Sequence, residues 1–144
     1  MTMTAARTDA TGGAGCTTAE LPCVPESVAR ARALVSSVLT GWGLEDDLAH
    51  VGEVIVSELM TNVVDHTETH LTEVVIERQV DSTVRIQVSD RSHVAPRMEK
   101  ATDDAECGRG LRLVDALCVR WGYDPNGGGK VTWAEIKAPA GGGR

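Results

Sequence analysis

The sequence predicts a two-layer α/β sandwich, in which helices cover one face of a mixed, mostly antiparallel sheet. Two segments in the first half of the chain carry apolar residues at helical spacing, whereas the segments from Val74 onward alternate apolar and polar residues, as strands do. The expected order is strand, helix, helix, two strands, a long loop, helix and two strands. Because so few helices cannot cover both faces of a sheet, we expect them to lie on one face.

The first expected elements are a short strand over residues 19–23 and a helix that follows it. The helix begins at Pro25, since proline is tolerated in the first turn of a helix. Its apolar residues recur at intervals of three and four residues, and it is expected to end near Gly41 or Gly43.

The second helix has the clearest pattern in the chain. Asp46 or Asp47 is expected to cap it, and the pattern continues to about His66. The apolar residues that repeat every three or four positions along it are Leu48, Val51, Val54, Ile55, Leu59 and Val63.

The second half of the chain is predicted to be mostly strands. Residues 74–80 and 84–89 alternate with a period of two on either side of a polar turn, which predicts an antiparallel hairpin. Two further strands are expected over residues 119–123 and 130–137. Between the two pairs, residues 91–107 have no clean period, and a loop of that length in a compact domain usually has a function.

The chain length of 144 residues predicts one domain. Hydrophobic residues make up 42% of the chain and charged residues 24%, which is ordinary for a folded domain and excludes disorder throughout. We expect a disordered N-terminal tail over residues 1–18, the domain over residues 19–137, and a flexible C-terminal tail over residues 138–144.

Composition and charge argue against two classes of partner. Three Trp, one Tyr and no Phe leave few aromatic platforms for stacking bases, and a net charge of −7 repels nucleic-acid backbones. No apolar run approaches the roughly 18 residues of a membrane span, and the N-terminus lacks the apolar core of a signal peptide. We therefore expect a cytoplasmic protein that binds neither nucleic acid nor membrane, with its four cysteines as free thiols.

One face of the second helix carries polar residues suited to a metal or a phosphate. Glu58 and Asn62 are four residues apart, which places them one turn apart on the same face, and Asp65 and His66 continue it. An amide oxygen suits Mg²⁺, and a carboxylate can orient or deprotonate a nucleophile. The alternative interpretation is that these residues form only the solvated face of an amphipathic helix.

Two further features lie on either side of the long loop. Asp90 ends the strand before it, where a carboxylate can accept a hydrogen bond from an exocyclic amine or simply form a turn. Gly108, Arg109 and Gly110 begin the helix after it, where glycines permit an anion to approach closely and the helix N-terminus stabilises it. A plain turn from loop to helix is the alternative for these three residues.

Taken in order, these features resemble the histidine-kinase-like (GHKL or Bergerat-type) ATPase superfamily. The chain looks most similar to its small stand-alone bacterial members, the anti-sigma-factor serine kinases and related ATP-binding regulators. The resemblance implies an α/β sandwich with a mobile lid over the nucleotide, and ATP and Mg²⁺ as cofactors. The resembling segments, which together cover about residues 19–137, are AELPCVPESVARARALVSSVL, VGEVIVSELMTNVVDHT, VRIQVSDRS, CGRGLRLVDALCVRWGY and GGGKVTWAEI.

The resemblance also implies roles for single residues. Asn62 would hold Mg²⁺ between the nucleotide phosphates, and Glu58 would be the general base in members that transfer a phosphoryl group. Asp90 would contact the adenine amino group, and Thr132 would support the adenine pocket through a water. His66 would face the phosphates at the end of its helix.

The same resemblance assigns the phosphate end of the nucleotide to the segment after the loop. Gly108 and Gly110 would bracket the phosphates, and Arg109 would neutralise part of their charge. Leu111, which follows them, and Asp65, on the second helix, are included in the expected nucleotide-binding set.

The function that the resemblance implies is a partner switch. The protein would be a serine/threonine kinase that uses Mg·ATP to phosphorylate an anti-sigma antagonist of the STAS type, would bind a sigma factor, and would form a homodimer. The alternative is a module of the same fold without catalysis, which senses ATP or binds proteins without nucleotide. That alternative is motivated by the acidic loop and by residues 91–96, which follow Asp90 and contain no glycine.

Two weaker motifs have ordinary explanations. His66 and His70 are four residues apart, a spacing that can bind Zn²⁺ if Cys16 or Cys107 supplies a third ligand, but histidines at a helix end or surface are the preferred interpretation. Residues 127–130, GGGK, resemble a phosphate loop only superficially and are interpreted as a hairpin turn.

Overall fold

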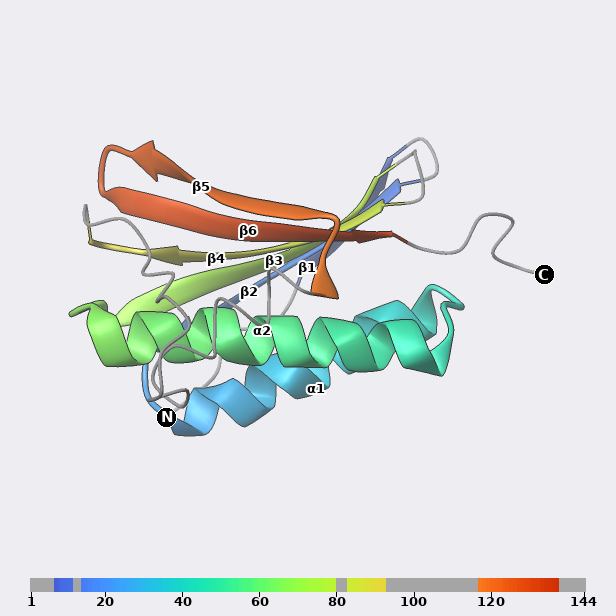
Figure 1. The fold of residues 1–144 in the computed structure, drawn as a ribbon, viewed down its shortest axis with the longest axis horizontal. Coiled ribbons are helices and arrows are strands. Elements are labelled where there is room, and N and C mark those ends of the chain that lie inside the picture. The colour runs from blue at the N-terminus through green and yellow to red at the C-terminus, as the bar shows by residue number, and fades with distance from the viewer. Residues whose placement is uncertain (1–6, 12–13, 80–82, 93–116, 138–144) are drawn as a thin grey trace.

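The computed structural model describes residues 7–11, 14–79, 83–92 and 117–137. Within them, the chain forms a six-stranded sheet and two helices, and both helices lie on one face of the sheet (Figure 1). The strand order is β1-β2-β3-β4-β6-β5, and every pairing among these strands is antiparallel. The two-layer α/β sandwich is confirmed, and the described sheet is antiparallel throughout, without the parallel pairing of a mixed sheet.

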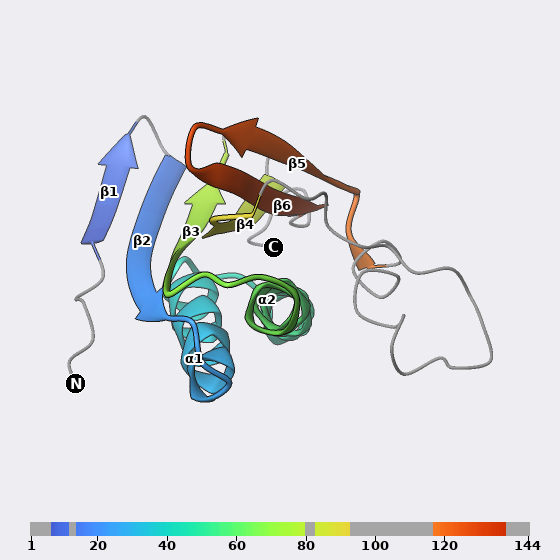
Figure 2. The ribbon, with the colours of Figure 1, turned by 90° about the vertical axis from the view of Figure 1, so that its left-hand side faces the viewer.

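The first two of the three expected helices are present. Helix α1 spans Glu26–Gly41, with Pro25 as its N-cap, and helix α2 spans Asp46–His66. The expectation that Asp46 or Asp47 caps α2 is wrong, because Glu45 occupies the cap and both aspartates lie in the first turn. There their charges interact favourably with the positive end of the helix dipole. Figure 2 shows the two helices side by side beneath the sheet.

Four strands follow α2 in the order expected. Strand β3 spans Leu71–Arg78, and β4 spans Thr83–Asp90, so Asp90 ends its strand as expected. Strand β5 spans Arg120–Asn126, and β6 spans Gly129–Lys137. Residues 127–128 join β5 to β6 as a two-residue hairpin turn, which confirms the interpretation of the GGGK segment.

The N-terminal segment differs from the expectation of a disordered tail over residues 1–18. Strand β1 spans Arg7–Thr11, and β2 spans Ala14–Pro22, so the short strand expected at residues 19–23 is the end of a longer one. Strand β2 pairs with β3 from Gly15 to Pro22, and β1 pairs with β2 at the sheet edge. The bonds between β2 and β3 join residues about 50 to 60 positions apart in the chain, so the local sequence pattern does not predict them.

The core lies between the sheet and the helices and is almost entirely aliphatic, as the lack of phenylalanine requires. No helix in the described part of the chain is long and apolar enough to span a membrane. Residues 93–116, which hold most of the loop and of the helix expected between β4 and β5, lie outside the described residues. The largest fully buried side chains are those of Leu21, Leu39, Ile55, Leu59, Met60, Ile76, Ile86 and Ile136.

Candidate functional site

The candidate site lies where the end of β4, the start of β6 and the C-terminal end of α2 meet, at the left of Figure 1. Asp90 pairs with Lys130 in the β4–β6 register, and Thr132 is two residues further along β6 on the same face. That face points toward the helices, since the alternate residues of both strands, such as Val88 and Ala134, are fully buried. The sheet register therefore places three polar residues at one end of an otherwise apolar layer.

Asp90 and Lys130 form a buried ion pair. Lys130 Nζ lies 2.9 Å from Asp90 Oδ2, and their side chains are only 3% and 0% exposed. The other carboxylate oxygen, Asp90 Oδ1, accepts a hydrogen bond of 2.8 Å from the backbone N–H of Ser92. Sequence reasoning missed Lys130, because β4 and β6 are not neighbours along the chain and no local pattern reports their register.

Two buried side-chain oxygens in this cluster have no hydrogen-bond partner. The Lys130 ammonium approaches Asp90 Oδ2 at ion-pair distance without hydrogen-bond geometry, so Oδ2 keeps a free acceptor site. Thr132 Oγ1 is also buried without a hydrogen-bond partner, and the residue is 2% exposed. Leaving a buried polar atom unpartnered costs about 1–3 kcal/mol, so such atoms call for an explanation, and a bound ligand is one.

A chain of hydroxyl groups ties the end of α2 to the end of β4. The Thr67 hydroxyl donates to the carbonyl oxygen of Val63 over 2.7 Å, and it lies 2.8 Å from the hydroxyl oxygen of Thr69. Thr69 Oγ1 in turn accepts a 2.9 Å hydrogen bond from the backbone N–H of Arg91. These contacts fix the last turn of α2 beside the residue that follows Asp90.

Gly129 brings β6 into close contact with the end of β4. It has a φ of +156°, and a Cβ atom at this position would lie 2.0 Å from the carbonyl oxygen of Asp90. Residues with a side chain rarely adopt that backbone conformation, and the space has no room for a Cβ atom. The glycine is a second feature that sequence reasoning missed, since the GGGK segment predicts a turn and not this contact.

Cys23, directly after β2, lies near the same cluster. Its backbone N–H donates a 2.7 Å hydrogen bond to the carbonyl oxygen of His70. Burial raises the pKa of the Cys23 thiol, and the negative charge of Asp90 raises it further. Both effects hold Cys23 in its neutral form beside the carboxylate. Cys16 and Cys23 are free thiols, while Cys107 lies outside the described residues.

The polar residues predicted on the second helix lie on α2. Glu58 and Asn62 are half-buried, one turn apart, and Asp65 is exposed one turn further on. Burial raises the pKa of Glu58, and among the described residues no cation pairs with this carboxylate. The backbone of His66 completes the helix, but its side chain is not described.

The expected phosphate-binding residues Gly108, Arg109, Gly110 and Leu111 lie outside the described residues, as does the lid. Asn62 is the predicted metal ligand. An amide oxygen is suited to Mg²⁺, which typically takes one or two protein ligands and completes its shell with substrate phosphates and water. Among the described side chains, which do not include those of His66 and Cys107, no three His, Cys, Asp or Glu come together as a metal site.

One comparison with known proteins bears on this site. The family model described as a histidine kinase-like ATPase domain matches residues 21–136, which include every element from the end of β2 to β6. No curated protein matches the chain.

Proposed function

Because the chain belongs to the histidine kinase-like ATPase domain family, we propose that it binds Mg·ATP at this site and transfers the terminal phosphoryl group to a serine or threonine of a small protein partner. The observation that carries the proposal is the pair of buried, unpartnered oxygens on Asp90 and Thr132. Apart from the ion pair of Asp90 Oδ2 with Lys130, no described group bonds to either atom. They suit the polar edge of a nucleotide base.

The base end of the nucleotide is assigned to β4 and β6. Asp90 Oδ2 accepts a hydrogen bond from the amino group of adenine, and the Thr132 hydroxyl contributes to the same pocket. The charge of Asp90 is held in place by its ion pair with Lys130 and by the Ser92 N–H. The carboxylate is therefore oriented before the ligand arrives, which lowers the ordering cost of binding.

The phosphate end of the nucleotide is assigned to α2. Asn62 supplies an amide oxygen to Mg²⁺, and the metal, when bound, neutralises charge on the phosphates. Glu58 is the general base: its carboxylate accepts the proton of the attacking hydroxyl as the oxygen bonds to the γ-phosphorus and ADP leaves with the bonding electron pair. A pKa raised by burial suits this role, because it makes Glu58 a stronger base.

The partners are proposed from the resemblance of the sequence to anti-sigma-factor kinases. The phosphorylated protein would be an anti-sigma antagonist of the STAS type, and the kinase would also bind a sigma factor. A homodimer is part of the same proposal.

Phosphoryl transfer tests the catalytic part. The full chain is incubated with ATP labelled at the γ-phosphate and with a panel of small antagonist domains, and label on the domain is measured. We expect transfer by the native chain and a loss of at least about 100-fold in Glu58→Ala, the usual contribution of a general base. Transfer to no domain, or equal transfer by Glu58→Ala, would contradict kinase activity.

A second candidate function is a binding module without turnover. It is favoured by the Lys130–Asp90 ion pair, because the carboxylate already has a cationic partner without any nucleotide. Calorimetric titration with ATP and with ADP separates the candidates. Binding of ATP without transfer to any partner would favour an ATP sensor, and no heat with either nucleotide would favour a nucleotide-free module.

A further inference from the structure

Lys130 is an unusual residue for its place in the sheet. On the helix-facing side of β6 it is followed by Thr132, Ala134 and Ile136, all of them buried. Taking an ammonium out of water is costly, and an ion pair in such a layer can often be replaced by apolar side chains without loss of stability. The packing of the fold therefore does not require a lysine here, which points to a role in the site.

The ion pair leaves one acceptor and several donors unused. Asp90 Oδ2 accepts no hydrogen bond, as described above. The Lys130 ammonium has three N–H groups, and among the described residues Asp90 is its only partner. The two side chains thus present an acceptor and a donor next to each other, 2.9 Å apart.

The Watson–Crick edge of adenine has the complementary pattern. Its 6-amino group is a donor, and the adjacent ring nitrogen N1 is an acceptor. Asp90 alone reads only the amino group, whereas the Asp90–Lys130 pair matches both atoms. Hypoxanthine, which has an acceptor at position 6 and a donor at N1, presents the reverse pattern.

We propose that Lys130 is a second base-reading residue, which donates a hydrogen bond to N1 of adenine while Asp90 Oδ2 accepts one from the 6-amino group. The inference rests on the proposed function, because it concerns the same ATP site. It makes Lys130 a determinant of base specificity as well as the partner that orients Asp90.

The test compares ATP with 1-deaza-ATP, in which a C–H group replaces N1 and the 6-amino group is retained. Dissociation constants of both nucleotides are measured with Mg²⁺ for the native chain and for Lys130→Met, which keeps the length of the side chain and removes its N–H groups. We expect the native chain to bind ATP at least about tenfold more tightly than 1-deaza-ATP, about 1.4 kcal/mol. In Lys130→Met we expect the ratio of the two dissociation constants to fall to about one. The variant has no N–H group to donate to N1, so replacing N1 by C–H then removes no hydrogen bond.

Thr132→Val is the matched control, because the Thr132 hydroxyl is the other polar group in the cluster. The inference expects this variant to keep the native ratio between ATP and 1-deaza-ATP. If Lys130→Met does not fold, as judged by circular dichroism, a preference for ATP that survives Thr132→Val still supports Lys130, and one that disappears overturns it.

Several results would overturn the inference. One is equal binding of the two nucleotides by the native chain, and another is an unchanged ratio in Lys130→Met. Each leaves the proposed ATP site intact as long as ATP itself binds. If the native chain binds neither nucleotide, the proposed function fails first, and the role of Lys130 fails with it.

Discussion

Gly129 lies against the backbone of Asp90 so closely that a Cβ atom on it would stand 2.0 Å from the Asp90 carbonyl oxygen and 2.5 Å from the Cα atom of Arg91. The turn between β5 and β6 therefore sets the position of the residue that begins the candidate site. Any side chain at position 129 has to move this backbone, and with it the carboxylate of Asp90.

We predict that Gly129→Ala lowers the free energy of unfolding by at least about 2 kcal/mol, because it adds steric overlap to an unfavourable φ. Gly127→Ala is the matched control, since a Cβ atom there would have no neighbour within 4 Å, and it should change stability by less than about 0.5 kcal/mol. Denaturant unfolding measures both variants. Equal midpoints for the two would show that the close contact does not exist.

The Asp90–Lys130 pair should behave as a buried ion pair. Lys130→Met leaves the Asp90 carboxylate buried without its cation, and we expect a loss of about 3 kcal/mol or more. Adding Asp90→Leu removes the remaining charge, so the double variant should be more stable than the single one. A double-mutant cycle by denaturant unfolding checks the coupling, and additive losses would contradict it.

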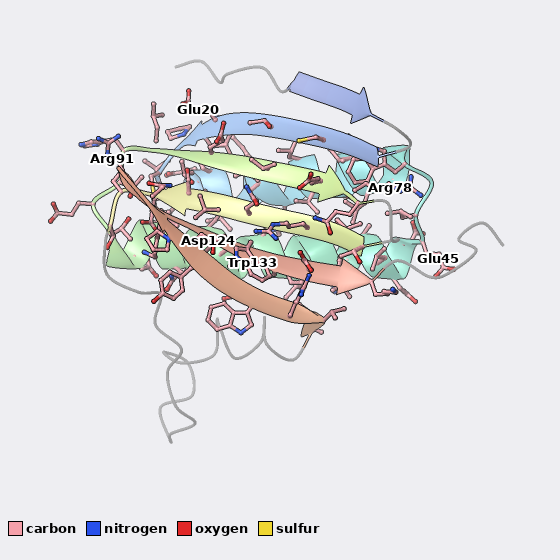
Figure 3. All side chains as sticks on the ribbon, turned by 90° about the horizontal axis from the view of Figure 1, so that it is seen from above. Glu20, Glu45, Arg78, Arg91, Asp124 and Trp133 are labelled. Atoms are coloured by element: carbon pink, nitrogen blue, oxygen red, sulfur yellow. The ribbon has the colours of Figure 1, made fainter. Side chains whose placement is uncertain are left out.

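The open face of the sheet carries a different charge cluster. Glu135 accepts hydrogen bonds from Arg85 at 3.0 Å and from Arg120 at 2.7 Å, and its side chain is only 4% exposed. Arg85 also stacks on Trp133, which Figure 3 shows on this face together with Asp124. These contacts join the edge strand β5 to β4 across β6.

Glu135→Gln should therefore destabilise the chain by about 2 kcal/mol, because the amide replaces a charged acceptor of two hydrogen bonds with a neutral one. Asp124→Ala is the control in the same cluster. Its carboxylate is 3.8 Å from Arg85 and 69% exposed, so we expect less than about 1 kcal/mol. Thermal unfolding of both variants measures the difference. Similar losses of stability in Glu135→Gln and Asp124→Ala would show that Glu135 is not the residue that holds this cluster together.

The strands and helices that the sequence predicts are those with a strong local pattern. Apolar spacing alone locates α2, because its buried stripe includes Ile55, Leu59 and Val63. The early part of β2 is stabilised by pairing with β3, at positions such as Thr17 opposite Ile76, and no period of its own reveals it. Local signals describe single elements, whereas the pairing of β2 with β3 depends on a partner distant in the chain.

The residues of the candidate site also fall into those that a local pattern predicts and those that depend on pairing between strands. Asp90 was predictable because it ends a strand with clear alternation, and Glu58 and Asn62 because helical spacing places them one turn apart. Lys130 was not, since its role depends on the register between β4 and β6. The resemblance to a known family supplied roles for single residues, but it pointed to Thr132 and not to the lysine two positions before it.

Burial raises the pKa of Glu58 above its ordinary value of 4.5, and this predicts a pH dependence of stability. Below pH 4.5 the carboxyl is protonated in both the folded and the unfolded chain, so burial has no electrostatic cost. As pH rises, the unfolded chain loses this proton first, and the folded state loses relative stability until its own carboxyl has ionised. The penalty is complete above the raised pKa.

Glu58→Gln should thus be more stable than the native chain at neutral pH, and its advantage should shrink as the pH is lowered through the raised pKa toward 4.5. Denaturant unfolding at several pH values measures the difference. An advantage that stays constant across this range would show that burial of the charge is not its cause.

The central claim is that this chain binds Mg·ATP with Asp90 at the base and Asn62 at the metal, and calorimetric titration of the full chain tests it most directly. We expect binding by the native chain, and at least about tenfold weaker binding by Asp90→Asn and by Asn62→Ala. Glu77→Gln on β3 should bind like the native chain, because it removes the same charge at the end of the sheet away from Asp90. No Mg-dependent binding by the native chain, or undiminished binding by Asp90→Asn, would contradict the claim.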